Sequence, residues 1–255
     1  MPNQWRRFWE LLLGMTEKEL RARYKYTVLG FLWLVLNPVL QMLIIGFIFT
    51  FFIKKPIEHY YYFLFTGLLI WNFFSLSLAK TTPSIVHERT LIKKAKFPRA
   101  VIPLSIILAN FFHTLLAFII FLIPVAFLGT FSFNKLPLLF ISLLLLLAFT
   151  VGFGLLTAAL NVRFRDVNFF TQALLIVWFY ASPIIYPLSM IPAKIHWLWF
   201  INPLSSMLEL SRVSLLGGEF HEKTTLWANM VFIVLTVLIG VVVFQKESAN
   251  FDDWV

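Results

Sequence analysis

The chain has 255 residues, of which 60% are hydrophobic and 13% charged, a balance that excludes an ordinary soluble domain and is typical of an integral membrane protein. The net charge of +9 does not indicate a nucleic-acid partner, because the basic residues lie in short segments beside long apolar runs, where membrane topology explains them. The sequence contains no cysteine, which excludes disulfides, thiolate metal sites and cysteine nucleophiles.

Residues 1–26 precede the first apolar run and have the pattern of an amphipathic helix that lies in the membrane interface. Four large apolar residues share a helical spacing there: Trp5, Phe8, Trp9 and Leu12. Gly14 predicts the end of this helix. Thr16, followed three residues later by Glu19, predicts a capping box that starts a second helix leading into the membrane.

Six segments are long and apolar enough to cross a bilayer as helices, which takes about 20 residues. The predicted spans are residues 27–53, 60–79, 100–123, 136–161, 168–188 and 224–245. The fold class expected is therefore an all-α integral membrane protein, with a transmembrane domain over residues 27–245 and a tail over residues 246–255.

Several residues inside these spans have a specific expected role. Asn37 and Gln41 are expected to face protein or a cavity rather than lipid. Gly152 and Gly154 predict the close approach of a neighbouring helix. His113 is expected to be packed and hydrogen-bonded, with a proton-transfer or metal role as the alternative.

Residues 189–223 are apolar but repeatedly interrupted by proline, glycine and charge. Their longest uncharged run, residues 195–208, is too short to cross a bilayer. This stretch is predicted to form a re-entrant or interfacial pair of helices, the outer hairpin, between the fifth and sixth spans.

The elbow, residues 80–99, is a basic island between two long apolar runs. It carries six Lys and Arg against a single acid, Glu88, and so cannot lie in lipid. Thr82 and Pro83 predict an N-cap and first helical position for a helix over residues 84–96. The positions of its cations favour an acidic partner, with Arg89, Lys93 and Lys96 on one face. The alternative interpretation is that they set membrane topology and meet anionic headgroups.

The Lys and Arg residues are distributed unevenly between the two sides of this arrangement. Of the 21 present, 15 fall in the N-terminal segment, the elbow, the loop near Asn161 and the tail. The positive-inside rule then places both termini in the cytoplasm.

Nothing in the sequence indicates catalysis: it lacks a GxxxxGK[ST] phosphate loop, an HExxH zinc motif and a GxSxG nucleophile elbow. No cofactor is expected on this chain. If ATP drives its function, another chain binds it.

Five stretches together resemble a known family: RARYKYTVLGFLWLVLNPVL, FTGLLIWNFF, LIKKAKFPRAVIPL, LNVRFRDV and ASPIIYPLSMIP. In order and spacing they resemble the type-2 ABC exporter permeases, and most of all the subunits that export O-antigen, capsule or teichoic-acid polysaccharide. The resemblance implies a homodimer in the cytoplasmic (inner) membrane, two copies of a separate ATPase subunit that binds ATP and Mg, and a lipid-linked polysaccharide as passenger.

The resemblance also implies roles for particular segments. Residues 84–96 would be the coupling helix, residues 1–26 the interface helix and residues 191–220 the outer gate helices. The residues expected to couple to the ATPase subunit are Glu88, Arg89, Lys93, Lys94 and Lys96.

Aromatic residues could line the conduit, because their faces stack on sugar C–H groups while trapping a moving polymer only weakly. The candidates are Trp71, Phe74, Trp178, Phe179, Tyr180 and Tyr186. The alternative is that these side chains anchor the protein to lipid at the membrane interface.

Two other functions fit parts of the same pattern. The same architecture could export a drug or another lipid. A membrane-embedded transferase acting on lipid-linked sugars would instead need clustered acidic or histidine residues, and the carboxylates on the outer side are only Glu58, Glu209, Glu219 and Glu222.

Overall fold

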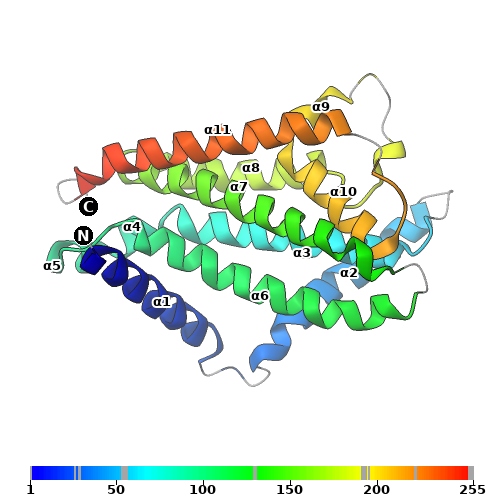
Figure 1. The fold of residues 1–255 in the computed structure, drawn as a ribbon, viewed down its shortest axis with the longest axis horizontal. Coiled ribbons are helices and arrows are strands. Elements are labelled where there is room, and N and C mark those ends of the chain that lie inside the picture. The colour runs from blue at the N-terminus through cyan, green and yellow to red at the C-terminus, as the bar shows by residue number, and fades with distance from the viewer. Residues whose placement is uncertain are drawn as a thin grey trace.

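The computed structural model describes residues 2–25, 27, 30–52, 57–128, 131–190, 194, 196–220 and 223–251. Regular structure in these residues is entirely helical, which confirms the predicted fold class. Figure 1 shows the long helices running roughly along one axis. The two labelled chain ends lie at the same end of the molecule as the short helices α4 (Ser84–His87) and α5 (Arg89–Lys94) of the elbow.

Five of the described helices are long and apolar enough to cross a membrane. They are α2 (Trp33–Phe52), α3 (Tyr60–Thr81), α6 (Val101–Ala126), α7 (Leu136–Arg163) and α11 (Lys223–Ser248). They fall within or close to the first, second, third, fourth and sixth predicted spans. The chain is a multi-pass membrane protein.

The fifth predicted span, residues 168–188, is only partly helical. Helix α8 (Asp166–Ala181) has 16 residues, about 24 Å of helix, which is less than the hydrocarbon thickness of about 30 Å. It ends there because Pro183 disfavours helical geometry at the residue before it, and Ser182 has an extended backbone with ψ 146°. The predicted boundary at residue 188 is therefore wrong, and a six-span topology stays a prediction.

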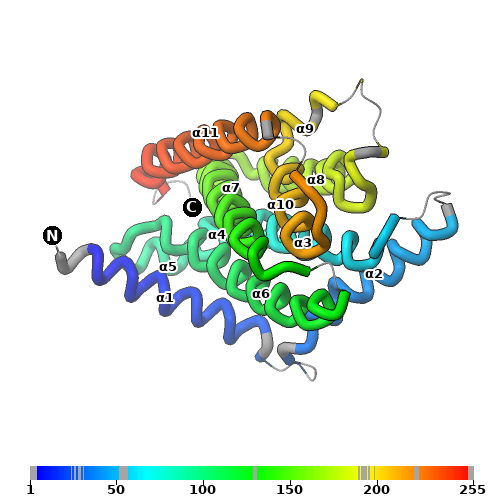
Figure 2. The backbone as a smooth tube through the Cα atoms, turned by 45° about the vertical axis from the view of Figure 1, so that its right-hand side comes forward, coloured from blue at the N-terminus to red at the C-terminus, as the bar shows by residue number. Residues whose placement is uncertain are grey.

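Helix α3 lies at the centre of the fold and is buried over most of its surface by α2, α6, α7, α8 and α10. The outer hairpin contains α9 (Trp197–Ile201) and α10 (Pro203–Leu216). Helix α10 packs against α3, α7 and α11, as Figure 2 shows. It begins at Pro203, because the Asn202 side chain accepts a hydrogen bond from the Leu204 amide and Pro203 suits the first turn.

Helices α7 and α11 approach each other backbone to backbone at two glycines. A Cβ added at Gly152 would lie 2.7 Å from the Val237 Cα, and one at Gly240 would lie 2.0 Å from the Gly152 carbonyl oxygen. The predicted close approach at Gly152 is confirmed. At Gly154 a Cβ would meet the Ile107 Cδ1 at 3.1 Å, so this position contacts α6 rather than α11.

The N-terminal segment forms one helix, α1 (Pro2–Tyr24), and the predicted break at Gly14 is wrong. The Thr16 hydroxyl donates to the Leu12 carbonyl, 2.7 Å away, instead of capping a second helix. Packing against α6 overrides the weak helix propensity of glycine, and Leu12 is 2% exposed. Figures 1 and 2 both show α1 alongside α6.

The contact between α7 and α11 generates a stability prediction. Gly152→Ala inserts a methyl group against the α11 backbone, and we expect the free energy of unfolding to fall by about 1–3 kcal/mol. Thermal unfolding of the purified protein in detergent measures the loss. Gly14→Ala is the matched control, because its Cβ meets nothing within 4 Å. Equal melting temperatures for the two variants would contradict the tight contact.

Candidate coupling elbow and translocation surface

The elbow consists of two short helices rather than the single helix predicted over residues 84–96. The chain turns at Glu88, where φ is −91° and ψ 22°, between α4 and α5. Thr82 does not cap a new helix: its amide donates to the Leu78 carbonyl and so continues α3, and its hydroxyl donates to the Thr157 hydroxyl of α7 at 2.9 Å. The predicted N-cap is therefore wrong.

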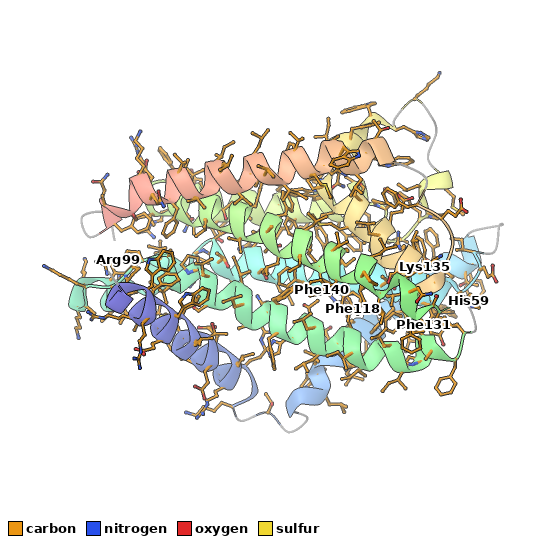
Figure 3. The ribbon with its side chains drawn as sticks, viewed as in Figure 1. His59, Arg99, Phe118, Phe131, Lys135 and Phe140 are labelled. Carbon is orange, nitrogen blue, oxygen red and sulfur yellow. The ribbon has the colours of Figure 1, made fainter. Side chains whose placement is uncertain are left out.

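Each elbow helix is anchored by one isoleucine. Ile85 and Ile92 are 0% and 2% exposed and belong to a small apolar core with Phe244 and Phe251 from the C-terminal end of the chain. Arg99 closes the elbow, because its Nη1 donates to the Ile92 carbonyl at 2.9 Å and to the Ala95 carbonyl at 3.0 Å. Figure 3 shows Arg99 at this end of the molecule. The elbow is thus held in one position relative to the helix ends.

The four predicted coupling cations all have exposed side chains: Arg89, Lys93, Lys94 and Lys96. The chain is extended at Ala95, so Lys96 lies beyond the end of α5. The expected face of three cations is therefore reduced to Arg89 and Lys93, one turn apart on α5. These four cations form an exposed positive surface at this end of the protein. Beneath it, Ile85 and Ile92 are buried.

Glu88, the single acid of the elbow, is paired with the N-terminal helix. The Lys18 ammonium of α1 lies 3.1 Å from the Glu88 carboxylate, with 59% and 33% of the two side chains exposed. An ion pair this exposed contributes less than about 1 kcal/mol to stability. Its significance is positional, because it ties the turn between α4 and α5 to α1.

Two of the six candidate channel aromatics lie inside the bundle. The Phe74 ring is fully buried and stacks on the Phe149 ring with centroids 5.4 Å apart. The Trp178 ring meets the Phe74 ring edge to face at 5.1 Å, and its Nε1 donates to the Asn202 side-chain oxygen at 3.0 Å. Within one chain, Phe74 is therefore packed in the core, whereas the half-buried Trp178 joins α3, α7, α8 and the start of α10.

Three other candidates meet at a cavity of about 340 Å³ between α2, α3 and α8. Trp71, Phe179 and Tyr180 line it, together with Gln41 and Asn72. The Phe179 ring lies 5.4 Å from the Trp71 ring and 5.2 Å from that of Tyr180, which is 65% exposed. This aromatic cavity combines ring faces with amide groups, a set that suits weak and repeated contact with a polyhydroxylated ligand.

Gln41, a polar residue of α2, is part of the same wall. The Asn72 amide of α3 donates to the Gln41 side-chain oxygen at 3.1 Å, and the Gln41 amide approaches the Asn37 side-chain oxygen at 3.5 Å. Gln41 lines this cavity and Asn37 lines a second one next to α1 and α6, so the prediction that both face protein or a cavity is confirmed. Tyr186, the sixth candidate, lies beyond the end of α8, where its hydroxyl donates to the Tyr180 carbonyl at 2.7 Å. It supports the aromatic cavity without lining it.

Arg212 is a residue whose role the sequence did not reveal, because its position in the outer hairpin, three residues after Glu209, indicated at most a local ion pair. Its guanidinium, almost fully buried, donates to the carbonyls of Pro183 and Ile184 at 2.6 and 2.9 Å. It also lies 3.4 Å from the centre of the Phe63 ring. A Cβ at Gly67 would come within 2.8 Å of it, so glycine makes room for the charge. Arg212 thus fixes the segment after α8 to α10 and α3.

Comparison with known families decides the identity of the chain. The family model for the ABC-2 type transporter matches residues 10–216, well over half of the sequence. The chain belongs to the ABC-2 type transporter family. The resemblance inferred from the five motifs is confirmed. In this ABC-2 chain the matched stretch runs from α1 through the elbow to the end of α10, so it includes every site described above.

Individual relatives are similar over almost the whole chain. An O-antigen export system permease protein RfbA of Klebsiella pneumoniae is 34% identical over 246 residues, covering 95% of this chain and 93% of the relative. The O-antigen export system permease protein RfbA of Myxococcus xanthus is 34% identical, with 94% of each chain covered. The polysialic acid transport protein KpsM of Escherichia coli is 27% identical, with 91% of each covered.

The buried arginine of this ABC-2 chain generates a second prediction. Arg212→Met removes the donors to two buried carbonyls, and we expect a loss of about 2–4 kcal/mol in the free energy of unfolding and faster proteolysis within residues 182–190. Thermal unfolding and limited proteolysis measure the two effects. Lys194→Met, at an exposed position of the outer hairpin, should change neither. A variant at Arg212 as stable as this control would refute the anchoring role.

Proposed function

We propose that this ABC-2 family chain is the membrane-spanning permease subunit of an ATP-driven exporter that moves lipid-linked polysaccharide out across the cytoplasmic membrane. The observation that carries the proposal is the similarity to O-antigen export permeases over more than nine-tenths of both chains. The relatedness to a polysialic acid transport protein supports the same class of passenger.

ATP hydrolysis belongs, in this proposal, to a separate ABC subunit that binds ATP and Mg. The exposed cations on α5 form its docking surface, because a positive patch favours an acidic partner and the buried Ile85 and Ile92 fix the elbow helices in place. The same proposal places the elbow, α1 and both termini in the cytoplasm, in agreement with the excess of Lys and Arg in these segments.

In this proposal the conduit forms between two copies of the chain, and one ATPase subunit docks on the elbow of each copy. The aromatic cavity between α2, α3 and α8 is the part of the surface that would meet the passenger. It is partly open, and the exposed faces of α2 and α8 flank it. Aromatic faces with few strong hydrogen-bond donors allow a sugar chain to bind and move on.

A charge-reversal pair tests the coupling role of the elbow. Arg89→Glu with Lys93→Glu should leave membrane insertion unchanged while export falls about tenfold, because repulsion disrupts docking to the ATPase subunit. Polymer export is measured in cells and ATP hydrolysis in the reconstituted complex. Lys246→Glu is the control, since it is an exposed lysine on the last turn of α11, at the same end of the molecule. Loss of insertion in the elbow variant would favour the topological interpretation.

Substitutions in the aromatic cavity test the passenger surface. Phe179→Ala and Tyr180→Ala should each slow polymer export roughly three- to tenfold, because each removes a ring that stacks on sugar, with folding and basal ATP hydrolysis unchanged. Phe170→Ala is the control, because it removes an aromatic of the same helix that is 68% exposed and does not line the cavity. Unchanged export in both cavity variants would exclude this surface from the conduit.

A further inference from the structure

Helix α3, the most buried of the five candidate spans, is open along one stripe. Between Phe63 and Thr81 every residue is buried except five that recur at helical spacing, namely Asn72, Ser75, Leu76, Ala79 and Lys80. Asn72 and Ser75 of this stripe line the aromatic cavity. Asn72 is also the single amide side chain of α3. This amide therefore lies where a ligand can reach the central helix.

Asn72 lies between two cavities. It lines the aromatic cavity and also a second cavity, of about 310 Å³, bounded by the C-terminal end of α1 and by α2, α3 and α6. In the second cavity the Arg23 guanidinium of α1 donates to the His113 Nδ1 at 2.5 Å. The prediction that His113 is packed and hydrogen-bonded is confirmed. The two cavities adjoin at Asn72, so the aromatic cavity is not closed on the side of α2.

The amide of Asn72 is bonded to its neighbours on α2 with capacity to spare. It donates to the Gln41 side-chain oxygen at 3.1 Å, and the Gln41 amide is 3.5 Å from the Asn37 side-chain oxygen. A primary amide can donate two hydrogen bonds and accept two. Among the described residues, no donor reaches the Asn72 side-chain oxygen. Hydrocarbon cannot satisfy this remaining capacity, whereas a polar ligand can.

The bond between Asn72 and Gln41 differs in its surroundings from the side-chain bonds that only hold helices together. Three such bonds are buried: Asn229 to Ser206, Thr82 to Thr157, and Ser142 to Ser211. The bond between Asn72 and Gln41 is only partly buried, and both of its residues line the aromatic cavity. A structural bond is strongest where water and ligands are excluded. The position of this pair in a cavity wall therefore favours a role in binding.

The lining of the aromatic cavity indicates the chemistry of the ligand. None of its described residues carries a charge, so a phosphate or carboxylate would meet no cation there. A hydroxyl group both donates and accepts hydrogen bonds, as the amides of Gln41 and Asn72 do. The Trp71 and Phe179 rings, with centroids 5.4 Å apart, offer faces to sugar C–H groups. The lining therefore matches an uncharged ligand with many hydroxyls.

We propose, on the basis of the export function proposed above, that Asn72 and Gln41 are the hydrogen-bonding residues of the passenger site and bind the hydroxyls of uncharged sugar residues. The passenger's hydroxyls replace the bond between the two side chains, donating to their oxygens and accepting from their amide groups. Because one hydrogen bond is exchanged for another, the net gain in binding free energy is small. A sugar chain can therefore bind, be released and move on.

A paired substitution separates binding from stability. Gln41→Leu with Asn72→Leu replaces both partners by apolar side chains of similar size, which should leave the melting temperature in detergent unchanged. We expect export of the cell's own polymer to fall about tenfold, because the hydrogen bonds to the passenger are lost. Gln41→Asn with Asn72→Gln keeps two amides and should retain export. Ser142→Ala with Ser211→Ala is the matched control, because it removes a bond between helices that lines neither cavity.

A second measurement does not depend on the stability of the leucine pair. The chain contains no cysteine, so Gln41→Cys introduces a single thiol into the aromatic cavity. In isolated membranes without ATP, we expect a water-soluble maleimide to label this thiol several-fold more slowly when the cells make the polymer than when its synthesis is blocked. Lys246→Cys, at an exposed position of α11, should be labelled equally in both membranes.

Two results would overturn the proposal. Normal export by a stable leucine pair would reduce the two amides to a structural link. If Phe179→Ala and Tyr180→Ala still slow export in that case, the proposed passenger surface stands and only the role of the amides falls. Equal labelling of Gln41→Cys with and without polymer would contradict contact between the passenger and this position. If the leucine pair fails to insert, the labelling result alone decides.

Discussion

Hydrocarbon offers no hydrogen-bond partner, so each polar group that enters the bundle must be satisfied by the chain itself or by a ligand. Most of the hydroxyls do this locally, by donating to the carbonyl one turn earlier, as Thr66, Thr150 and Thr236 do. Larger polar groups need partners from other helices, and those pairings hold the architecture together. Arg212 bonds to two carbonyls after α8, and Arg23 bonds to α6.

This constraint explains why the two ends of the molecule differ. At the elbow end the charged side chains are exposed while Ile85 and Ile92 are buried, so the charges are accessible to a partner. At the opposite end a single buried arginine organises the outer hairpin. Figure 3 shows Lys135 at that end, where its ammonium donates to the Gly218 carbonyl at 2.8 Å and closes the loop after α10. Force applied at the elbow would reach this end through α3, which contacts both.

The fold class and the long helices could be predicted from the sequence because uninterrupted apolar runs leave a helix as almost the only solution in lipid. Gly152 could be assigned to a helix contact because small residues in membrane-spanning helices allow a neighbouring helix to approach closely. Local boundaries were harder. The break expected at Gly14 did not occur because tertiary packing against α6 outweighs the low helix propensity of glycine. The turn at Glu88 was not predicted because neither glycine nor proline occurs there.

The candidate sites were less accessible to sequence reasoning than the fold. The basic surface of α5 was visible as a composition, but no pattern separated Phe74, which is buried, from Tyr180, which is exposed. The distinction depends on which face of the helix packs against its neighbours. A helix that is apolar on every side has no polar face to indicate this. Arg212 was missed for the same reason: its partners are backbone carbonyls 28 and 29 residues away, which no side-chain pattern reveals.

We propose that this chain is a permease whose energy comes from a separate ATPase docked on the elbow. Gentle purification of the tagged protein from its native membranes, followed by mass spectrometry and an ATP hydrolysis assay, tests it most directly. We expect a stoichiometric ABC ATPase subunit that hydrolyses ATP and is lost when Arg89 and Lys93 are both reversed in charge. A chain that purifies alone and without ATP hydrolysis, in a detergent that preserves a known complex of the same family, would contradict it.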